Sequence, residues 1–181
     1  MMGFAAIAAP AQEAPKSGVR AWSVRELTDL EGKLVKLAEA MPQEKYTWRP
    51  GEGVRSVSEV YLHVANGNFG YPTFLGATPA AGIERRGLEK STTEKAKVVA
   101  LLKQSFDYMR QGIEKVPDAD LEKPLKVFGR DSNYAAVILL AVTHAHEHLG
   151  QSIAYARMNG VVPPWTEEQQ QRQRQQPAPR Q

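Results

Sequence analysis

Three of the four histidines lie close together in the chain, at His144, His146 and His148. The chain contains no cysteine, so any metal ion must be held by imidazole or carboxylate groups. The lack of cysteine also excludes disulfide scaffolds, iron–sulfur clusters and a thiol nucleophile supplied by the protein. The positions of the histidines therefore carry most of the chemical information in the sequence.

The secondary structure of this segment decides which imidazoles share a face. A strand would place all three on one face, because side chains in a strand alternate with a period of two. A helix turns by about 100° per residue, so His148 lies about 40° from His144 and His146 about 200° from it. Residues 134–142 are apolar without alternation, which favours a helix. His144 and His148 then point into the protein, and His146 points outward or into a neighbouring groove.

The fourth histidine, His63, is predicted to lie midway along a second helix. It shares a helical face with Val60, Gly67, Gly70 and Phe74, which form a stripe of small and apolar residues. The two glycines allow another helix, or a ligand, to come close to the backbone. This stripe is therefore where a facing helix would bring its own side chains against His63.

Together, His63, His144 and His148 would supply three nitrogen ligands for a divalent metal ion. Three protein ligands leave coordination positions for water or a substrate, as in catalytic rather than structural metal sites. Three imidazoles suit zinc, nickel, iron or copper almost equally. The sequence thus predicts a divalent metal ion without fixing its identity. The alternative interpretation is that each histidine is a satisfied residue of the core.

Four segments show the spacing of apolar residues that predicts amphipathic helices: 22–40, 56–75, 91–116 and 134–159. Ser56 with Glu59, and Ser91 with Glu94, match the capping-box pattern, so both pairs are predicted to begin helices. A short extended piece is expected at 126–128. With no convincing strand alternation elsewhere, the sequence predicts an all-α protein, a four-helix bundle with long connecting loops and disordered termini.

At 181 residues, the chain is predicted to hold one folded domain, residues 19–165. Residues 1–18 contain a short apolar run followed by small residues, and we interpret them as the remnant of a secretory signal peptide or as a disordered arm. Export to the periplasm and a cytoplasmic location both stay open. Residues 166–181 are rich in Gln, Arg and Pro, which predicts a disordered tail.

The charge pattern argues against a nucleic-acid partner. The net charge is +3 and the isoelectric point is about 9.1, but the basic residues are scattered among acidic ones rather than gathered in a stripe. No run of 18 or more apolar residues exists, so neither a transmembrane helix nor a membrane partner is predicted. We expect a small-molecule substrate, and a homodimer stays open as the assembly.

Two other metal motifs do not fit. The segment 143–148 is similar to the His-x-His-x-Asp-His signature of metallo-β-lactamase-like hydrolases, but its spacing is one residue short and no histidine follows His148. The His-Glu-x-x-His motif of zincins is also missing, because Glu147 is followed by His148 and Leu149.

Several segments in order resemble the DinB-like (DNA-damage-inducible) family of metalloenzymes, and together they cover nearly the whole folded region. They are 48–57 before the second helix, the spacing from Ser56 to His63, the pattern His144-x-x-x-His148-x-Gly150-Gln151, and the exit at 159–164. One position departs from the family pattern. Leu149 stands where family members often carry arginine, so an anion contact through that side chain is not expected here.

The resemblance implies a four-helix bundle with a divalent metal ion on His63, His144 and His148. Because the family includes transferases that use small bacterial thiols, we expect a metal-dependent transferase acting on a low-molecular-weight thiol. A divalent cation suits this role because it lowers the pKa of a bound thiol or water. A metal-dependent hydrolase and a non-catalytic bundle that binds a metal or ligand are the alternatives.

Three further side chains are candidate catalytic residues. Glu147 is offset by about 60° from His144 on a helix, and is a candidate general base or partner of a metal ligand, with a solvated surface acid as the alternative. Gln151 and Tyr155 share the face of the paired histidines and are candidates for orienting a ligand or substrate. Polar packing in the core is the alternative for both.

Two pairs outside the helices are also assigned roles. Trp48 and Arg49 are candidates to close the mouth of the site, although Trp48 could simply anchor its loop. Arg85 and Arg86 are interpreted as solvated side chains.

Overall fold

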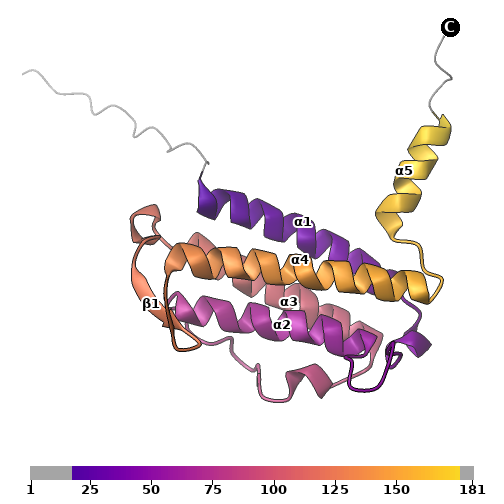
Figure 1. Cartoon of the computed structure of the whole chain (residues 1–181), viewed down its shortest axis with the longest axis horizontal. Coiled ribbons are helices and arrows are strands. Elements are labelled where there is room, and N and C mark those ends of the chain that lie inside the picture. The colour runs from indigo at the N-terminus through magenta and orange to yellow at the C-terminus, as the bar shows by residue number, and fades with distance from the viewer. Residues whose placement is uncertain (1–17, 176–181) are drawn as a thin grey trace, which may run out of the picture.

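All four predicted helices are present in the computed structural model, which describes residues 18–175. They are α1 (Val19–Ala40), α2 (Val57–Phe74), α3 (Lys95–Glu114) and α4 (Tyr134–Met158). Figure 1 shows them lying side by side along a common direction. Helices α1 and α2 each pack against both α3 and α4. This arrangement confirms the predicted four-helix bundle.

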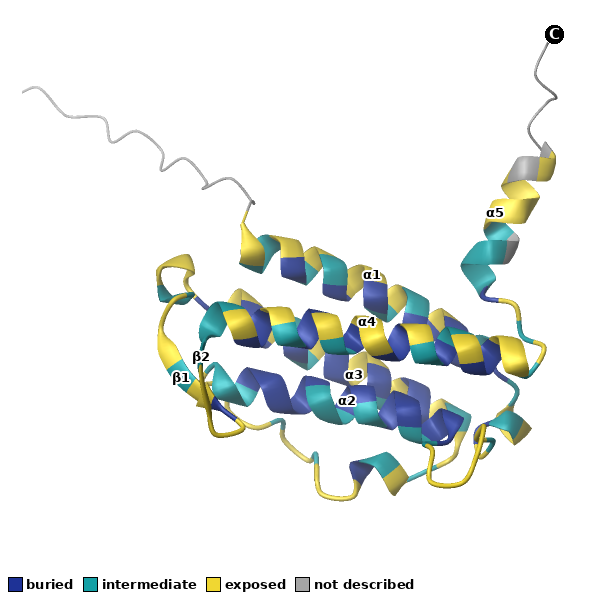
Figure 2. Cartoon of the chain, in the orientation of Figure 1, coloured by how far each residue is buried: buried dark blue, intermediate teal, exposed yellow. Residues whose placement is uncertain are grey.

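Buried and exposed residues alternate around each helix of the bundle (Figure 2), and most of the buried ones are apolar. On α1, the regularly spaced residues Leu27, Leu30, Leu34 and Leu37 are completely buried. Their recurrence every three or four residues places them on one side of the helix, where burial of apolar surface stabilises the fold. The same periodicity that predicted the helix therefore forms the core.

The start of α2 follows the local capping signal. The backbone N–H of Glu59 donates to Ser56 Oγ at 3.3 Å, and the backbone N–H of Ser56 donates to Glu59 Oε2 at 2.7 Å. Two N–H groups that the helix leaves unpaired are thereby satisfied. The predicted capping box at Ser56 is confirmed, and it sets the register that His63 follows.

The second predicted capping box, at Ser91, is wrong. Ser91 instead ends the short 3₁₀ helix η2 (Leu88–Lys90), and α3 begins only at Lys95. The backbone N–H of Lys95 donates to the side-chain oxygen of Gln43 at 2.7 Å. Gln43 belongs to η1 (Gln43–Lys45), another 3₁₀ helix. A side chain distant in sequence thus accepts a hydrogen bond from the first turn of α3. The local pattern at Ser91 predicts a helix start four residues earlier.

The connection between α3 and α4 contains the extended piece expected from the sequence. After the 3₁₀ helix η3 (Asp118–Asp120), strands β1 (Pro124–Val127) and β2 (Arg130–Asn133) pair as an antiparallel hairpin. Phe128 and Gly129 form the two-residue turn, with φ angles of 48° and 80°. Positive φ at both central residues is the geometry of the tightest hairpin turns, and it is uncommon for a phenylalanine.

The C-terminal region differs from the predicted disordered tail, because α5 (Pro164–Gln175) is helical. Proline is favourable at the start of a helix, and Gln, Glu and Arg are good helix formers. Trp165 packs against the core, and Lys36 of α1 lies 3.1 Å from the Glu168 carboxylate.

Residues 1–17 and 176–181, which include most of the predicted arm and the end of the tail, lie outside the described residues. No described helix is long and apolar enough to span a membrane.

Candidate metal centre

Three imidazoles converge between α2 and α4. His63 comes from α2, and His144 and His148 come from successive turns of α4. One ring nitrogen from each lies within 4.8 Å of the others, and the ring centroids are separated by 4.6 to 4.9 Å. The structure thereby brings together the three histidines that the sequence nominated as metal ligands.

His146 does not join this group. Its side chain is about half exposed, and its Nε2 lies 3.6 Å from the carboxylate of Glu26 on α1. This position agrees with the helical register, which turns His146 away from its neighbours on α4.

Two of the three imidazoles are oriented by hydrogen bonds at Nδ1. His63 Nδ1 lies 2.6 Å from Glu89 Oε1, and His148 Nδ1 lies 2.8 Å from Gln151 Oε1. An ionised carboxylate and an amide oxygen only accept hydrogen bonds, so each Nδ1 carries the proton. In the neutral imidazole, Nε2 is then left with a free lone pair, which is the form that binds a metal ion.

The orientation of Gln151 is itself fixed by a short chain of hydrogen bonds. The Tyr155 hydroxyl donates to the Arg55 carbonyl oxygen at 3.1 Å, so it accepts from Gln151 Nε2, also at 3.1 Å. The amide oxygen of Gln151 is therefore the atom that faces His148. Both Gln151 and Tyr155, predicted to orient a ligand or substrate, act on the position of His148 in this structure.

His144 is the least anchored member of the group. Its Nε2 lies 3.1 Å from His63 Nε2, while its Nδ1 is buried with no hydrogen-bond partner among the described residues. If Nε2 of His144 carries no proton, two lone pairs face each other. If it does, the buried Nδ1 has an unpaired lone pair, which is costly. Three convergent imidazole nitrogens form a donor set that fits a divalent cation.

The ionisation states agree with such a cation. Burial lowers the pKa of His144 to about 4 and also lowers the pKa of His148. Burial would raise the pKa of Glu89, but hydrogen bonds from Arg55 and His63 outweigh this and lower it. At neutral pH, His144 and His148 are therefore neutral, and the Glu89 carboxylate beside His63 is ionised.

Glu89 is a functional residue that the sequence analysis missed. It lies on η2, where Oε1 faces His63 and Oε2 accepts from Arg55 Nε at 2.9 Å. Because η2 belongs to a connection rather than to a periodic helix, no spacing rule relates Glu89 to His63. An isolated acidic residue in a long loop was the only available signal.

The other predicted side chains lie around the site. Glu147 is exposed, and within the described part of the chain no hydrogen bond joins it to the three imidazoles. Trp48 packs edge-on against Tyr155 with ring centroids 5.4 Å apart, so it anchors its loop. Arg49 pairs with Glu59 at 3.2 Å.

A cavity of about 240 Å³ adjoins the imidazoles of His63 and His144. One wall is the face of α2 from residue 66 to residue 74, and the remaining walls include Arg85 and Phe128. Arg85 is exposed, as the sequence interpretation expected, and it also lines the cavity.

Four packed helices with an inward-facing group of three histidines define a helical-bundle protein with a candidate metal centre. The family model of the DinB superfamily matches residues 26–152. The chain belongs to this superfamily, as its sequence motifs indicated.

Solved structures support the same fold. A DinB-like protein from Bacillus cereus superimposes with a TM-score of 0.69 at 15% identity, covering 78% of this chain and 93% of that one. A DinB-like protein from Bacillus subtilis gives a TM-score of 0.63 at 21% identity, with the same coverage. YfiT from Bacillus subtilis, described as a probable metal-dependent hydrolase with an unusual four-helix bundle topology, gives 0.63 at 14% identity and covers 86% and 95%. No curated protein sequence matches the chain significantly.

Proposed function

We propose that this protein is a metal-dependent transferase that holds one divalent ion on His63, His144 and His148 and acts on a low-molecular-weight thiol. The observation that supports this most directly is the convergence of three imidazoles at the edge of a cavity. Because three protein ligands converge among residues 18–175, a coordination position stays available for a substrate atom on the cavity side.

The protein supplies orientation rather than a nucleophile. Glu89 fixes His63, and the chain from Gln151 to Tyr155 fixes His148, so that both Nε2 atoms stay available. A divalent ion held there would lower the pKa of a thiol or a water molecule that it coordinates. Since the chain has no cysteine, the sulfur must come from the substrate. In the transfer, the thiol proton leaves to solvent, a sulfur–carbon bond forms and the bond from that carbon to its leaving group breaks.

A metal-dependent hydrolase is the second candidate. It is supported by the fold shared with YfiT, described as a probable metal-dependent hydrolase, and by a cavity large enough for water beside the imidazoles. The same three histidines would hold the ion. The two candidates differ only in whether the available position takes a thiol or water.

Cobalt substitution separates these candidates. When 2-mercaptoethanol is added to the cobalt protein, we expect an intense near-ultraviolet charge-transfer band, which titrates with a pKa below the roughly 8.5 of a free thiol. The same preparation should transfer the thiol to 1-chloro-2,4-dinitrobenzene faster than His144→Ala does, while His146→Ala retains the band. A cobalt protein that shows neither the band nor transfer dependent on His144 would contradict the transferase and favour the hydrolase.

A further inference from the structure

The side chain of Arg85 lies along α2 at the edge of the cavity. Its Nε donates to the backbone oxygen of Asn66 at 3.3 Å and to the Asn66 side-chain oxygen at 3.1 Å. The guanidinium lies directly over Gly70, where a Cβ would collide with it. The absence of a side chain at Gly70 therefore allows Arg85 to lie against the helix backbone.

The charge of Arg85 has no counter-ion within residues 18–175. Among these residues, no carboxylate forms an ion pair with Arg85, and its two hydrogen bonds both come from Nε, so Nη1 and Nη2 donate none. Its aromatic neighbours Tyr71 and Tyr108 both have a raised pKa, with burial as the main cause, so both are neutral at physiological pH. An anchored guanidinium with two unused amino groups is suited to an anionic group, which it can bind through two parallel hydrogen bonds.

The guanidinium and the metal centre share one wall. A Cβ at Gly67 would lie only 2.7 Å from His144 Cε1, so the imidazole rests on Gly67 as the guanidinium rests on Gly70. The two glycines are three residues apart on α2, which corresponds to about 4.5 Å along the helix axis. One small molecule can therefore reach both groups, with a few bonds between the atom at the imidazoles and the atom at Arg85.

Part of the cavity lining is apolar. The rings of Phe74 and Phe128 pack edge-on with centroids 5.6 Å apart, and Phe128 is 77% exposed although it is a large aromatic residue. It is held there by the hairpin turn, in a backbone conformation that is uncommon for phenylalanine. The aromatic pair provides an apolar surface for the carbon skeleton of a ligand, but no charge to compete with Arg85.

We propose that Arg85 is the anion-binding residue of the cavity, and that the substrate is a small organic anion with its acidic group a few bonds from the atom held at the three histidines. This inference rests on the proposed function, since it names the substrate class of the same site. Leu149 is buried in the core, so the anion contact is assigned to a different element, the connection that follows α2.

The test compares two thiols that differ only in charge, 3-mercaptopropionate and 3-mercaptopropionamide. Each is titrated into the cobalt protein, and the charge-transfer band gives its dissociation constant. Arg85→Gln should weaken binding of the acid about tenfold, because a charge-assisted hydrogen bond is lost, and should change binding of the amide less than twofold. Arg85→Lys should restore part of the affinity. Arg86→Gln, which changes the neighbouring exposed arginine outside the cavity lining, should affect neither thiol.

The outcomes separate this inference from the proposed function. If both thiols give the band but Arg85→Gln weakens them equally or not at all, the anion-binding role is overturned and the metal centre stands. If neither thiol gives a band, the transferase is contradicted, and 3-phenylpropionate is titrated into metal-free protein by calorimetry. Binding that Arg85→Gln weakens and Arg86→Gln preserves supports the anion site by itself. Equal binding by all three proteins, or none, overturns it.

Discussion

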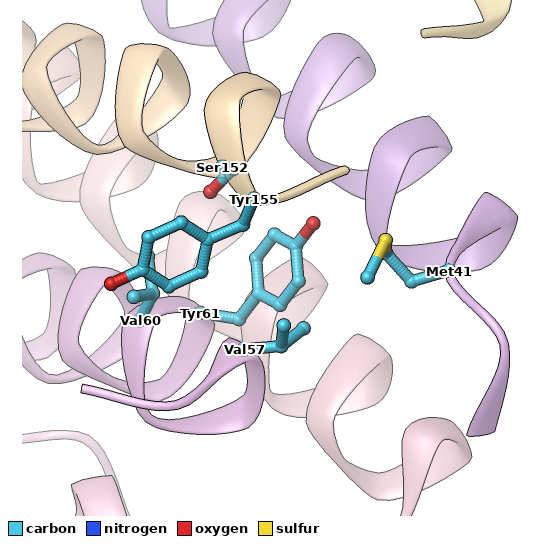
Figure 3. A pocket seen from close by; sticks show the side chains of 6 residues that line it. All are labelled: Met41, Val57, Val60, Tyr61, Ser152 and Tyr155. Carbon is cyan, nitrogen blue, oxygen red and sulfur yellow. The ribbon is translucent and has the colours of Figure 1, made fainter. Parts of the chain in front are cut away.

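The packing between helices α2 and α4 differs on the two sides of the three-histidine group. On the side of the α2 N-terminus, Val60, Tyr61 and Tyr155 fill the space between the helices (Figure 3), and the remaining hollow has no room for a water molecule. On the other side, Gly67 and Gly70 leave a cavity of about 240 Å³. The same pair of helices thus forms a sealed core and an open cavity, and the size of the side chains on α2 decides which.

This difference assigns separate tasks to the two sides. The sealed side holds the helices in register through burial of apolar surface. The open side lacks such packing, so the imidazoles of His63 and His144 and the guanidinium of Arg85 are accessible to a ligand. Substitutions on the sealed side, apart from Tyr155, which also orients Gln151, should therefore change stability without changing metal affinity. Substitutions on the open side should do the reverse.

The largest expected effect is on the sealed side. Met41 lines the sealed hollow and is 1% exposed, so Met41→Ala should lower the free energy of unfolding by about 3 kcal/mol. Urea denaturation of metal-free protein measures this. Cobalt affinity, measured by calorimetry on the folded variant, should stay within twofold of the original. Phe128→Ala on the open side should lower the free energy of unfolding by less than about 1 kcal/mol, because exposed side chains contribute little. A tenfold loss of cobalt affinity in Met41→Ala would show that the two sides are not independent.

The next effect is on the open side, at Gly67. A methyl group there would lie 2.7 Å from His144 Cε1, so the imidazole must move away from its position. We expect Gly67→Ala to weaken cobalt binding about tenfold or more, because metal affinity falls when a ligating imidazole is moved out of position. The free energy of unfolding should change little. The matched control is Gly150→Ala on α4, where no atom lies within 4 Å of the added carbon. Unchanged cobalt affinity in Gly67→Ala would mean that His144 is not a ligand in the position described.

A third effect is the pH dependence of the metal-free protein, which probes the burial of the imidazoles between the two sides. In the folded protein, burial lowers the pKa of His144 to about 4, from 6.5 in its ordinary state. As the pH falls below 6.5, the unfolded chain takes up the proton first, so the free energy of unfolding should decrease down to about pH 4. The melting temperature should fall over this range, and His144→Gln should reduce the slope. A slope equal in both proteins would contradict the burial of His144.

The sequence predicted those parts of the molecule that local rules determine. Helical periodicity placed α1 to α4, and it separated His146 from His144 and His148. The capping box at Ser56 was correct because its two partners are only three residues apart. The resemblance to the DinB-like family agreed with these elements, and the family model confirms it.

The parts that the sequence did not predict depend on contacts between distant residues. The start of α3 depends on Gln43, which is distant in sequence and accepts a hydrogen bond from Lys95 N–H. Glu89 reaches His63, and Arg85 reaches the cavity, from a connection whose path no periodic pattern describes. Helical periodicity predicted the imidazoles as metal ligands because the histidines lie on regular helices. It could not predict the side chains that orient the imidazoles or that complete the cavity.

The central claim is that His63, His144 and His148 together hold one divalent ion. The most direct test is the metal content of protein prepared without a histidine tag, loaded with cobalt or zinc, dialysed and measured by elemental analysis. We predict about one equivalent in the original protein and in His146→Ala, and loss of that equivalent in His63→Ala, His144→Ala and His148→Ala, with circular dichroism confirming that each variant is folded. A full equivalent retained by folded His144→Ala, or lost from His146→Ala, would contradict the account.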